Sequence, residues 1–260
     1  MSHPLIQNPS ELKSRNFSYY APLAMLFVMF LMMANLTAQK LVAVGTGMLT
    51  GGNFIYPATY VISALLTEVY CYAMSRKVIW LGLGCNVLMI VAIKLVILLP
   101  SAAGWAEADQ AAFVAVLDRT PQIVLASLVA FFVGEFTNTC ILAKSKVFTT
   151  GKYLGLRAVF STIIGQAIDS VLFTLIAFWG VLHWHELGVL TATMYIFKLI
   201  VELAALPIIY MVASFLKRKE GVDIFDRRTR FNPFWLTGLR EVDQPLTTQA
   251  TLFDENSREF

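Results

Sequence analysis

Six apolar stretches divide this chain into a series of predicted membrane-spanning helices. Each has about 20 residues or somewhat more, enough for a helix to cross the roughly 30 Å of hydrocarbon in a bilayer. Their apolar residues come in long runs and do not alternate with polar ones as in a half-buried strand. The stretches are residues 18–39, 55–74, 78–99, 122–143, 158–182 and 188–216. We therefore predict an all-α membrane protein with six transmembrane helices.

Polar segments at both ends define the expected domain organisation. We expect a cytoplasmic N-terminal tail over residues 1–17, a transmembrane transport domain over 18–216 and a cytoplasmic basic, polar tail over 217–260. The C-terminal tail lacks long apolar periodicity, which is typical of a partly disordered segment. The first apolar stretch is too long for a cleavable signal sequence, so we interpret it as a retained helix.

The composition agrees with a membrane protein and argues against a single soluble core. Hydrophobic residues make up 57% of the chain and charged residues 14%, against about 45–50% and about 25% in soluble domains. The cysteines Cys71, Cys85 and Cys140 lie in or beside apolar stretches and have neither zinc-ligand spacing nor a disulfide pattern. We expect no metal and no cofactor.

Lysine and arginine are strongly biased toward one side of the predicted membrane. The other side has only Lys40 and Arg119. The basic side has Lys13, Arg15, Arg76, Lys77, Lys144, Lys146, Lys152, Arg157, Lys217, Arg218 and Lys219. Because cytoplasmic loops carry the excess of basic residues, both termini are predicted to be cytoplasmic, which fits an even number of helices. We therefore predict a multi-pass protein of the cell inner membrane.

Several polar side chains lie where a membrane helix should be apolar. A charge at the helix centre costs about 2.5–3.5 kcal/mol on insertion scales, so intramembrane charges mark candidate functional sites. Spacings of three or four residues place Asn138 near Glu135, Gln166 near Asp169, and Lys198 near Glu202 on their helices. The candidate substrate-binding or coupling residues are Asn35, Glu68, Glu135, Asn138, Gln166, Asp169, Ser170, Lys198 and Glu202.

Structural explanations compete with these functional ones. Lys198 and Glu202 are one turn apart and could simply neutralise each other. Glu135 and Asp169 have no neighbouring cation in the sequence, so each needs a partner from another helix, a ligand, a proton or water. Asn35 and Asn86 fit ordinary hydrogen bonding between helices.

The polar inventory suits a flat ligand with several N–H donors. A carboxylate can accept two parallel N–H bonds from a planar donor edge, and aromatic side chains could cover the ligand's face. The candidate aromatic residues are Phe131, Phe132, Phe173, Tyr195 and Phe197. Chemistry alone would equally admit an amine, a vitamin or an ion.

A set of short motifs resembles the queuosine precursor transporter family, also called the vitamin uptake transporter family. The motifs are Tyr56-Pro57-Ala58-Thr59-Tyr60, Leu66-Thr67-Glu68-Val69-Tyr70, Arg76-Lys77-Val78-Ile79-Trp80, Gly134-Glu135-Phe136-Thr137-Asn138, Lys144-Ser145-Lys146, Arg157, Ser161-Thr162, Gly165-Gln166, Asp169-Ser170, Phe173, Lys198, Glu202 and Pro207. The resemblance implies a 7-deazaguanine base or queuine as cargo. Two positions depart from the family pattern, because Ala64 stands where many members have aspartate and Cys71 where many have glycine.

Three mechanisms remain open at this point. The first is alternating access around a midplane site, with a coupling proton as one option and the lipid bilayer as the setting. The second makes the chain the substrate-binding subunit of an energy-coupling-factor importer, which needs a partner that hydrolyses ATP. The third is an intramembrane enzyme, disfavoured because no histidine lies near mid-membrane. A structural subunit of a larger complex is a weaker reading, and nucleic-acid binding is not indicated.

Overall fold

The computed structural model describes residues 17–38, 40–45, 47–117, 121–180, 183–224, 226 and 232–234. The expected N-terminal tail apart from Phe17, and most of the expected C-terminal tail, therefore lie outside the described residues, as does Arg119. Statements about the structure below refer to these ranges.

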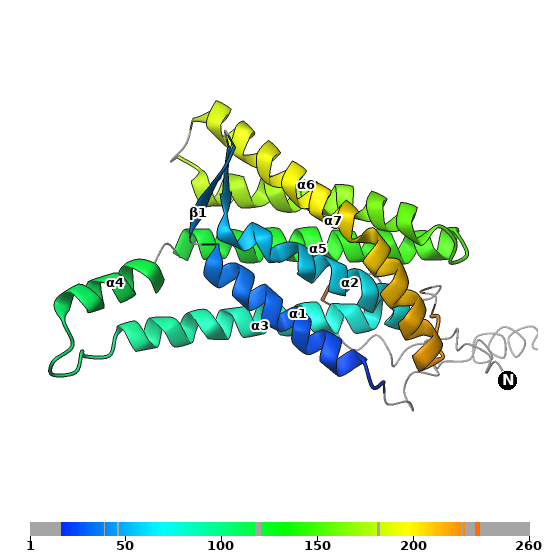
Figure 1. Cartoon of the computed structure of the whole chain (residues 1–260), viewed down its shortest axis with the longest axis horizontal. Coiled ribbons are helices and arrows are strands. Elements are labelled where there is room, and N and C mark those ends of the chain that lie inside the picture. Colours follow the sequence, from blue (N-terminus) through cyan, green and yellow to red (C-terminus); the bar gives the residue numbers. More distant parts are fainter. Residues whose placement is uncertain are drawn as a thin grey trace, which may run out of the picture.

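The described chain is a helical bundle with one short hairpin (Figure 1). Its helices are α1 Tyr20–Thr37, α2 Tyr56–Tyr70, α3 Tyr72–Ile97, α4 Glu107–Leu117, α5 Pro121–Phe148, α6 Leu154–Phe178 and α7 Trp184–Glu220. Strands β1 Leu41–Val44 and β2 Gly47–Thr50 pair antiparallel, and the 3₁₀ helix η2 Gly51–Phe54 follows them. The prediction of a helical protein is confirmed, apart from this hairpin.

In the described part of the chain, five helices are long and apolar enough to cross a membrane. These spans are Tyr20–Thr37, Tyr72–Ile97, Leu125–Phe148, Leu154–Phe178 and Trp184–Glu220. Helix α2 has 15 residues, whereas a helix that crosses the whole bilayer needs about 20. Six crossings and cytoplasmic termini stay predictions.

Helix α2 is the central element of the bundle. It contacts α1, α3, α5 and α7, and nearly all of its side chains are buried. A helix that is buried all round needs no polar face of its own. Because its neighbours enclose it, α2 can carry polar side chains that the lipid never meets.

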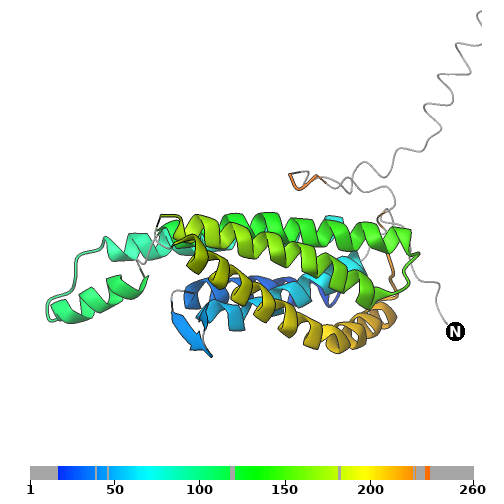
Figure 2. The same cartoon turned by 90° about the horizontal axis from the view of Figure 1, so that it is seen from above.

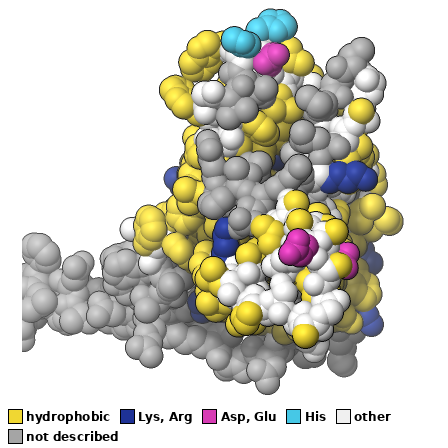
Figure 3. Space-filling model, turned by 90° about the vertical axis from the view of Figure 1, so that its left-hand side faces the viewer, with side chains coloured by type: hydrophobic (Ala, Val, Ile, Leu, Met, Phe, Trp, Pro, Cys, Tyr) yellow, Lys and Arg dark blue, Asp and Glu magenta, His cyan; other side chains and the backbone are white. Residues whose placement is uncertain are grey.

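The outer surface of the bundle is largely hydrophobic. Figure 3 shows hydrophobic side chains over much of the described surface at the end near α4. Large apolar side chains such as Leu88, Leu156 and Met211 are well exposed. A soluble monomer rarely exposes so much apolar surface, and lipid is the solvent that suits it.

Two local predictions were wrong. No helix was predicted between the stretches 78–99 and 122–143, yet residues 107–117 form α4, with Glu107 and Asp109 in its first turn. Its alanines favour a helix, and acidic residues near a helix N-terminus are stabilising. The hairpin was also unexpected; Gly45, at φ +58°, supplies the positive φ that its short turn favours.

Helices α5 and α6 form the closest pair, as Figure 2 shows. A Cβ on Gly134 would lie 2.8 Å from the Cβ of Asp169, and one on Gly165 would lie 2.7 Å from the Cβ of Asn138. Real Cβ atoms do not approach so closely, so both positions require glycine. These two contacts bring the polar residues of α5 and α6 face to face.

A break at Cys71 separates α2 from α3. Cys71 is fully buried and has φ +78° and ψ +164°, a region occupied almost only by glycine, and such conformations cost about 1–3 kcal/mol. The resembled family often has glycine at this position. The break divides the predicted 55–74 helix, so that α2 stays central while α3 continues from Tyr72.

We expect Cys71→Gly to raise the thermal unfolding midpoint in detergent, because glycine adopts this backbone without strain. The gain in free energy of unfolding should approach the strain of about 1–3 kcal/mol at this backbone conformation, reduced by the small contribution of the lost thiol contacts. Cys85→Gly is the matched control: Cys85 lies inside α3, where glycine should cost about 1 kcal/mol. Equal losses in both variants would show that Cys71 is not strained.

Candidate functional site

An ion pair between α6 and α7 forms the centre of the candidate site. Lys198 Nζ donates to Asp169 Oδ2, and both side chains are almost completely buried. The ammonium also lies 4.8 Å from the centroid of the Tyr56 ring on α2, within cation–π range. Lys198 therefore joins three helices at one point.

The predicted pairing of Lys198 with Glu202 is corrected by the structure. Glu202 instead accepts hydrogen bonds from Thr162 Oγ1 and from Gln166 Nε2, at 2.5 and 3.0 Å. The spacing of four residues does put both α7 side chains on one face, but α6 packs against that face. Since α6 supplies a carboxylate to Lys198 and two donors to Glu202, contacts between helices replace the contact within α7.

Glu135 on α5 is the carboxyl group with the least compensation. It is fully buried, and its Oε1 atom accepts one long bond of 3.3 Å from Thr139 Oγ1. Its Oε2 atom has no hydrogen-bond partner among the described residues. A buried carboxylate without a cation carries a large desolvation cost, so its ionised form is poorly supported in this state.

Other buried polar atoms of the bundle also lack partners within the described chain. Those near the central carboxyl groups include Asn53 Nδ2, Tyr60 Oη, Asn138 Oδ1, Gln166 Oε1 and Ser170 Oγ. Buried polar groups in proteins are almost always hydrogen-bonded, so each exception calls for an explanation. Most of these atoms can accept a hydrogen bond, which suits a ligand rich in N–H donors.

A narrow cavity reaches the ion pair from the hairpin end of the bundle. Its walls include Asn35, Asn53, Phe173, Asp169 and Lys198. The free volume is about 20 Å³, which is room for a water molecule but not for a purine-sized base. A base could therefore reach Asp169 only if the surrounding helices move apart.

Asn35 lies in the cavity wall and also connects helices. Its Nδ2 atom donates to Asn86 Oδ1 of α3 at 2.8 Å, and its Oδ1 atom accepts from Ser127 Oγ of α5 at 2.5 Å. The hydrogen bond expected between helices is present. Asn35 is thus held in place at the edge of the cavity.

Eight of the nine predicted residues lie in the central polar region of the bundle. Asn35, Asp169 and Lys198 line the cavity, while Gln166 and Glu202 lie about one turn further from the hairpin end. The other three are Glu135, Asn138 and Ser170, all buried on α5 and α6.

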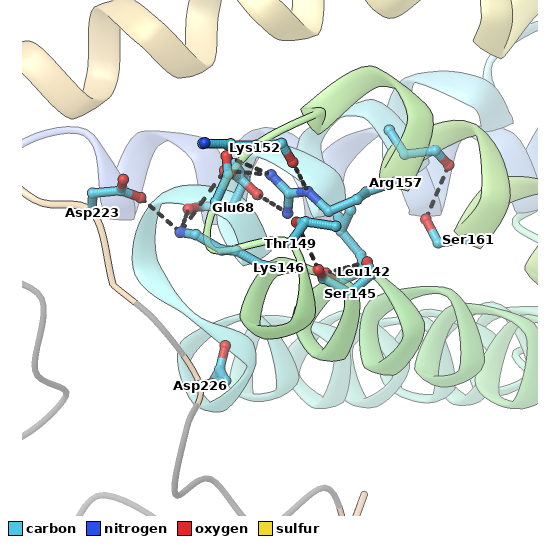
Figure 4. Close-up of polar contacts among 12 residues, drawn as sticks. Glu68, Leu142, Ser145, Lys146, Thr149, Lys152, Arg157, Ser161, Asp223 and Asp226 are labelled. Carbon is cyan, nitrogen blue, oxygen red and sulfur yellow. Dashed lines mark hydrogen bonds and ion pairs between the residues drawn. The ribbon is translucent and has the colours of Figure 1, made fainter.

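Glu68 lies apart from this group, in an ion cluster at the far end of the bundle (Figure 4). Arg157 donates two bonds to its carboxylate, at 3.0 and 3.2 Å, and Lys217 Nζ lies 2.6 Å from Oε1. Lys146 and Lys217 also contact Asp223, at 2.8 and 2.9 Å. We call these five residues the basic-end cluster.

The basic-end cluster shifts the titration of its outermost member. Burial alone would raise the pKa of the Asp223 carboxyl, but Lys146 and Lys217 outweigh it, so that the pKa falls below its usual range. Asp223 is therefore ionised at neutral pH.

Sequence reasoning missed Tyr56 and Tyr60, which the structure places at the centre. Tyr56 lines the cavity, and Tyr60 is fully buried one turn along α2. The available signal was the pair of hydroxyl groups four residues apart in an otherwise apolar stretch. Of the aromatic residues proposed to cover a ligand, Phe173 lines the cavity, whereas Phe132 packs on Trp80 near α3.

We expect Lys198→Met to lower the free energy of unfolding by about 3–5 kcal/mol, because it leaves the Asp169 carboxylate buried without its partner. The double variant Lys198→Met with Asp169→Asn should recover most of that loss, whereas Lys198→Met with Glu202→Gln should recover little. Thermal unfolding in detergent measures all three. Better recovery with Glu202→Gln would contradict the observed pairing.

Comparison with known proteins identifies the family. A family model described as "Putative vitamin uptake transporter" matches residues 50–212, more than half of the chain. A protein of Bacillus subtilis (strain 168) named "Probable queuosine precursor transporter" is 28% identical over 191 residues, which cover 72% of this chain and 81% of that protein. No solved structure matches.

Both matches are to transporters, and five helices are able to span a membrane. The protein is therefore a multi-pass transporter of the cell inner membrane and not an enzyme. Because the family model matches more than half of the chain, including every residue of the central polar group except Asn35, the chain belongs to the vitamin uptake transporter family.

Proposed function

We propose that this protein imports queuosine precursors, namely 7-deazaguanine bases or queuine, across the inner membrane. The observation that carries the proposal is the buried Asp169–Lys198 pair in the wall of a cavity, near polar atoms that have no partner among the described residues. The name of the Bacillus subtilis relative and the motif resemblance support the same substrate class.

The chemistry of the site fits a guanine-like edge. Such an edge presents two adjacent N–H donors and one carbonyl oxygen. The Asp169 carboxylate can accept the two parallel N–H bonds, and the Lys198 ammonium can donate to the carbonyl. Tyr56 and Phe173 line the same cavity and offer ring faces for stacking. Binding would exchange the Asp169–Lys198 bond for bonds to the base.

Alternating access is the mechanism that we propose for transport. The cavity approaches the ion pair from the hairpin end, which faces outward if the basic end is cytoplasmic. The small free volume of about 20 Å³ fits a state in which the outer path is nearly closed. Outward opening would admit the base, and inward opening would release it toward the cytoplasm.

Glu135 is our candidate for carrying a coupling proton. The central region contains three buried carboxyl groups, Asp169, Glu202 and Glu135, and one buried ammonium, that of Lys198. Asp169 has the ammonium, whereas Glu202 and Glu135 have only neutral donors. Charge balance therefore favours a proton on one of these two, and Glu135 has the longer described contact. Ser63 and Tyr60 of α2 face the same region. A proton could enter with the base and leave when water reaches Glu135 from the cytoplasm.

The direct test measures queuosine in the tRNA of cells that cannot make its precursors. With low external precursor, expression of this protein should restore queuosine. No restoration, with protein verified in the membrane, would contradict the substrate class. Restoration that requires an added ATP-hydrolysing partner, with no uptake by the isolated protein in liposomes, would instead favour the energy-coupling-factor subunit.

We expect Asp169→Asn to abolish restoration while leaving the protein in the membrane, because an amide removes an acceptor and the charge. A hydrogen bond to a charged group contributes about 1.5–3 kcal/mol, so precursor affinity should fall by about tenfold to 100-fold. Glu107→Gln, at an exposed site on α4, is the control and should behave as wild type. Normal uptake by Asp169→Asn would remove Asp169 from the site.

For Glu135→Gln we expect selective loss of coupling. In liposomes, a pH gradient with an acidic exterior should drive accumulation of 7-deazaguanine by wild type. The variant should still exchange labelled for unlabelled base but should not respond to the gradient, since glutamine cannot bind and release a proton. Gradient-driven accumulation by the variant would assign the proton to another group.

A further inference from the structure

The basic-end cluster connects α2, α5, α6 and α7, four helices that also contribute to the central polar region. Glu68 comes from α2, Lys146 from α5, Arg157 from α6 and Lys217 from α7. The cavity that reaches Asp169 lies toward the other end of these helices. The two polar sites therefore lie in series along the helices of one bundle (Figure 1). Buried side chains such as Ser63, Thr67 and Leu142 lie on the helices between them.

The chain after α7 completes the cluster from outside the helices. Gly221, at φ +64°, ends α7 and turns the chain back. Asp223 then meets both lysines, Ile224 accepts a 2.7 Å bond from Lys146 through its carbonyl, and Asp226 accepts one of 3.0 Å from the Tyr72 amide. Val222 and Ile224 are fully buried and pack in the same core as Cys71. Val222, Ile224 and Asp226 therefore lie against the α2–α3 break.

The charges of the cluster make it easy to open when water enters. Three cations, Lys146, Arg157 and Lys217, share two carboxylates, Glu68 and Asp223, so losing either carboxylate contact leaves the cations repelling one another. A buried ion cluster stabilises a fold less well than apolar packing would, because dehydrating the charges offsets their attraction. When the cluster separates, water hydrates its charged groups again, and this offsets the loss of their mutual attraction. Separating an apolar contact would bring no such gain.

We propose that the basic-end cluster, with Asp223 as its outer member, is the gate that closes the cytoplasmic side of the transport path. The gate rests on the proposed function, because it gives the central site its second exit. In the observed state it is closed while the cavity points toward the hairpin end. When the base is bound, Lys217 and Asp223 move away from Glu68, and Val222 and Ile224 move away from Cys71.

Cys71 provides a built-in reporter for this movement. It is fully buried beside Val222 and Ile224, and the chain has only two other cysteines to remove. In a Cys85→Ser, Cys140→Ser background, a bulky water-soluble maleimide should label Cys71 slowly in lipid nanodiscs. Adding 7-deazaguanine or queuine should accelerate labelling, and Asp169→Asn should cancel that acceleration.

Weakening the gate should expose Cys71 without any ligand. Asp223→Asn keeps the size of the side chain and lies at the partly exposed rim of the cluster, so the protein should still fold. We expect labelling to be faster by about tenfold, the effect of weakening the closed state by about 1.4 kcal/mol. Glu107→Gln on α4 is the matched control and should label like the parent.

The outcomes separate the gate from the proposed function. Faster labelling in Asp223→Asn supports the gate even if neither base is transported, in which case only the proposed substrate falls. Unchanged labelling in Asp223→Asn overturns the gate. Labelling that stays slow in a preparation shown to take up the base also overturns it, because a purely structural cluster would remain closed during transport.

Discussion

The buried ion pairs of this bundle join side chains from different helices, and that constraint organises the whole molecule. Lys198 of α7 reaches Asp169 of α6, and Arg157 of α6 reaches Glu68 of α2. Lipid cannot hydrate these groups, so the helices that carry them cannot separate without water, a ligand or a proton replacing the lost partner. A fold held in this way is coupled to its cargo by the same groups that hold it together.

The close contact of α5 with α6 makes this compensation possible. With glycine at 134 and 165, the two backbones approach until Asp169 and Asn138 touch the opposite helix. Glu135 and Gln166 are carried into the same region, and α7 then adds Lys198 and Glu202. Small residues at such contacts are the usual means of packing membrane helices tightly. Here they also determine which polar side chains meet.

The sequence predicted the helical membrane fold and most of the central group, because long apolar runs and costly charges are local signals. It could not predict partners. The four-residue spacing suggested an ion pair between Lys198 and Glu202. Because α6 packs against α7, Lys198 instead pairs with Asp169. Glu68 looked like a site residue for the same reason as Asp169, yet it lies in the basic-end cluster. The break at Cys71 and the role of Tyr56 depend on tertiary contacts that no spacing encodes.

Enclosure of α2 has a consequence for biogenesis. With 15 residues, several of them polar, this helix offers the insertion machinery a short and weakly apolar segment. Its buried tyrosines and Glu68 become favourable only when α5, α6 and α7 supply their surroundings. These three helices are synthesised after α2. The central helix can therefore pack stably only after α5, α6 and α7 have been inserted, and assembly of the bundle becomes a late, post-insertion event.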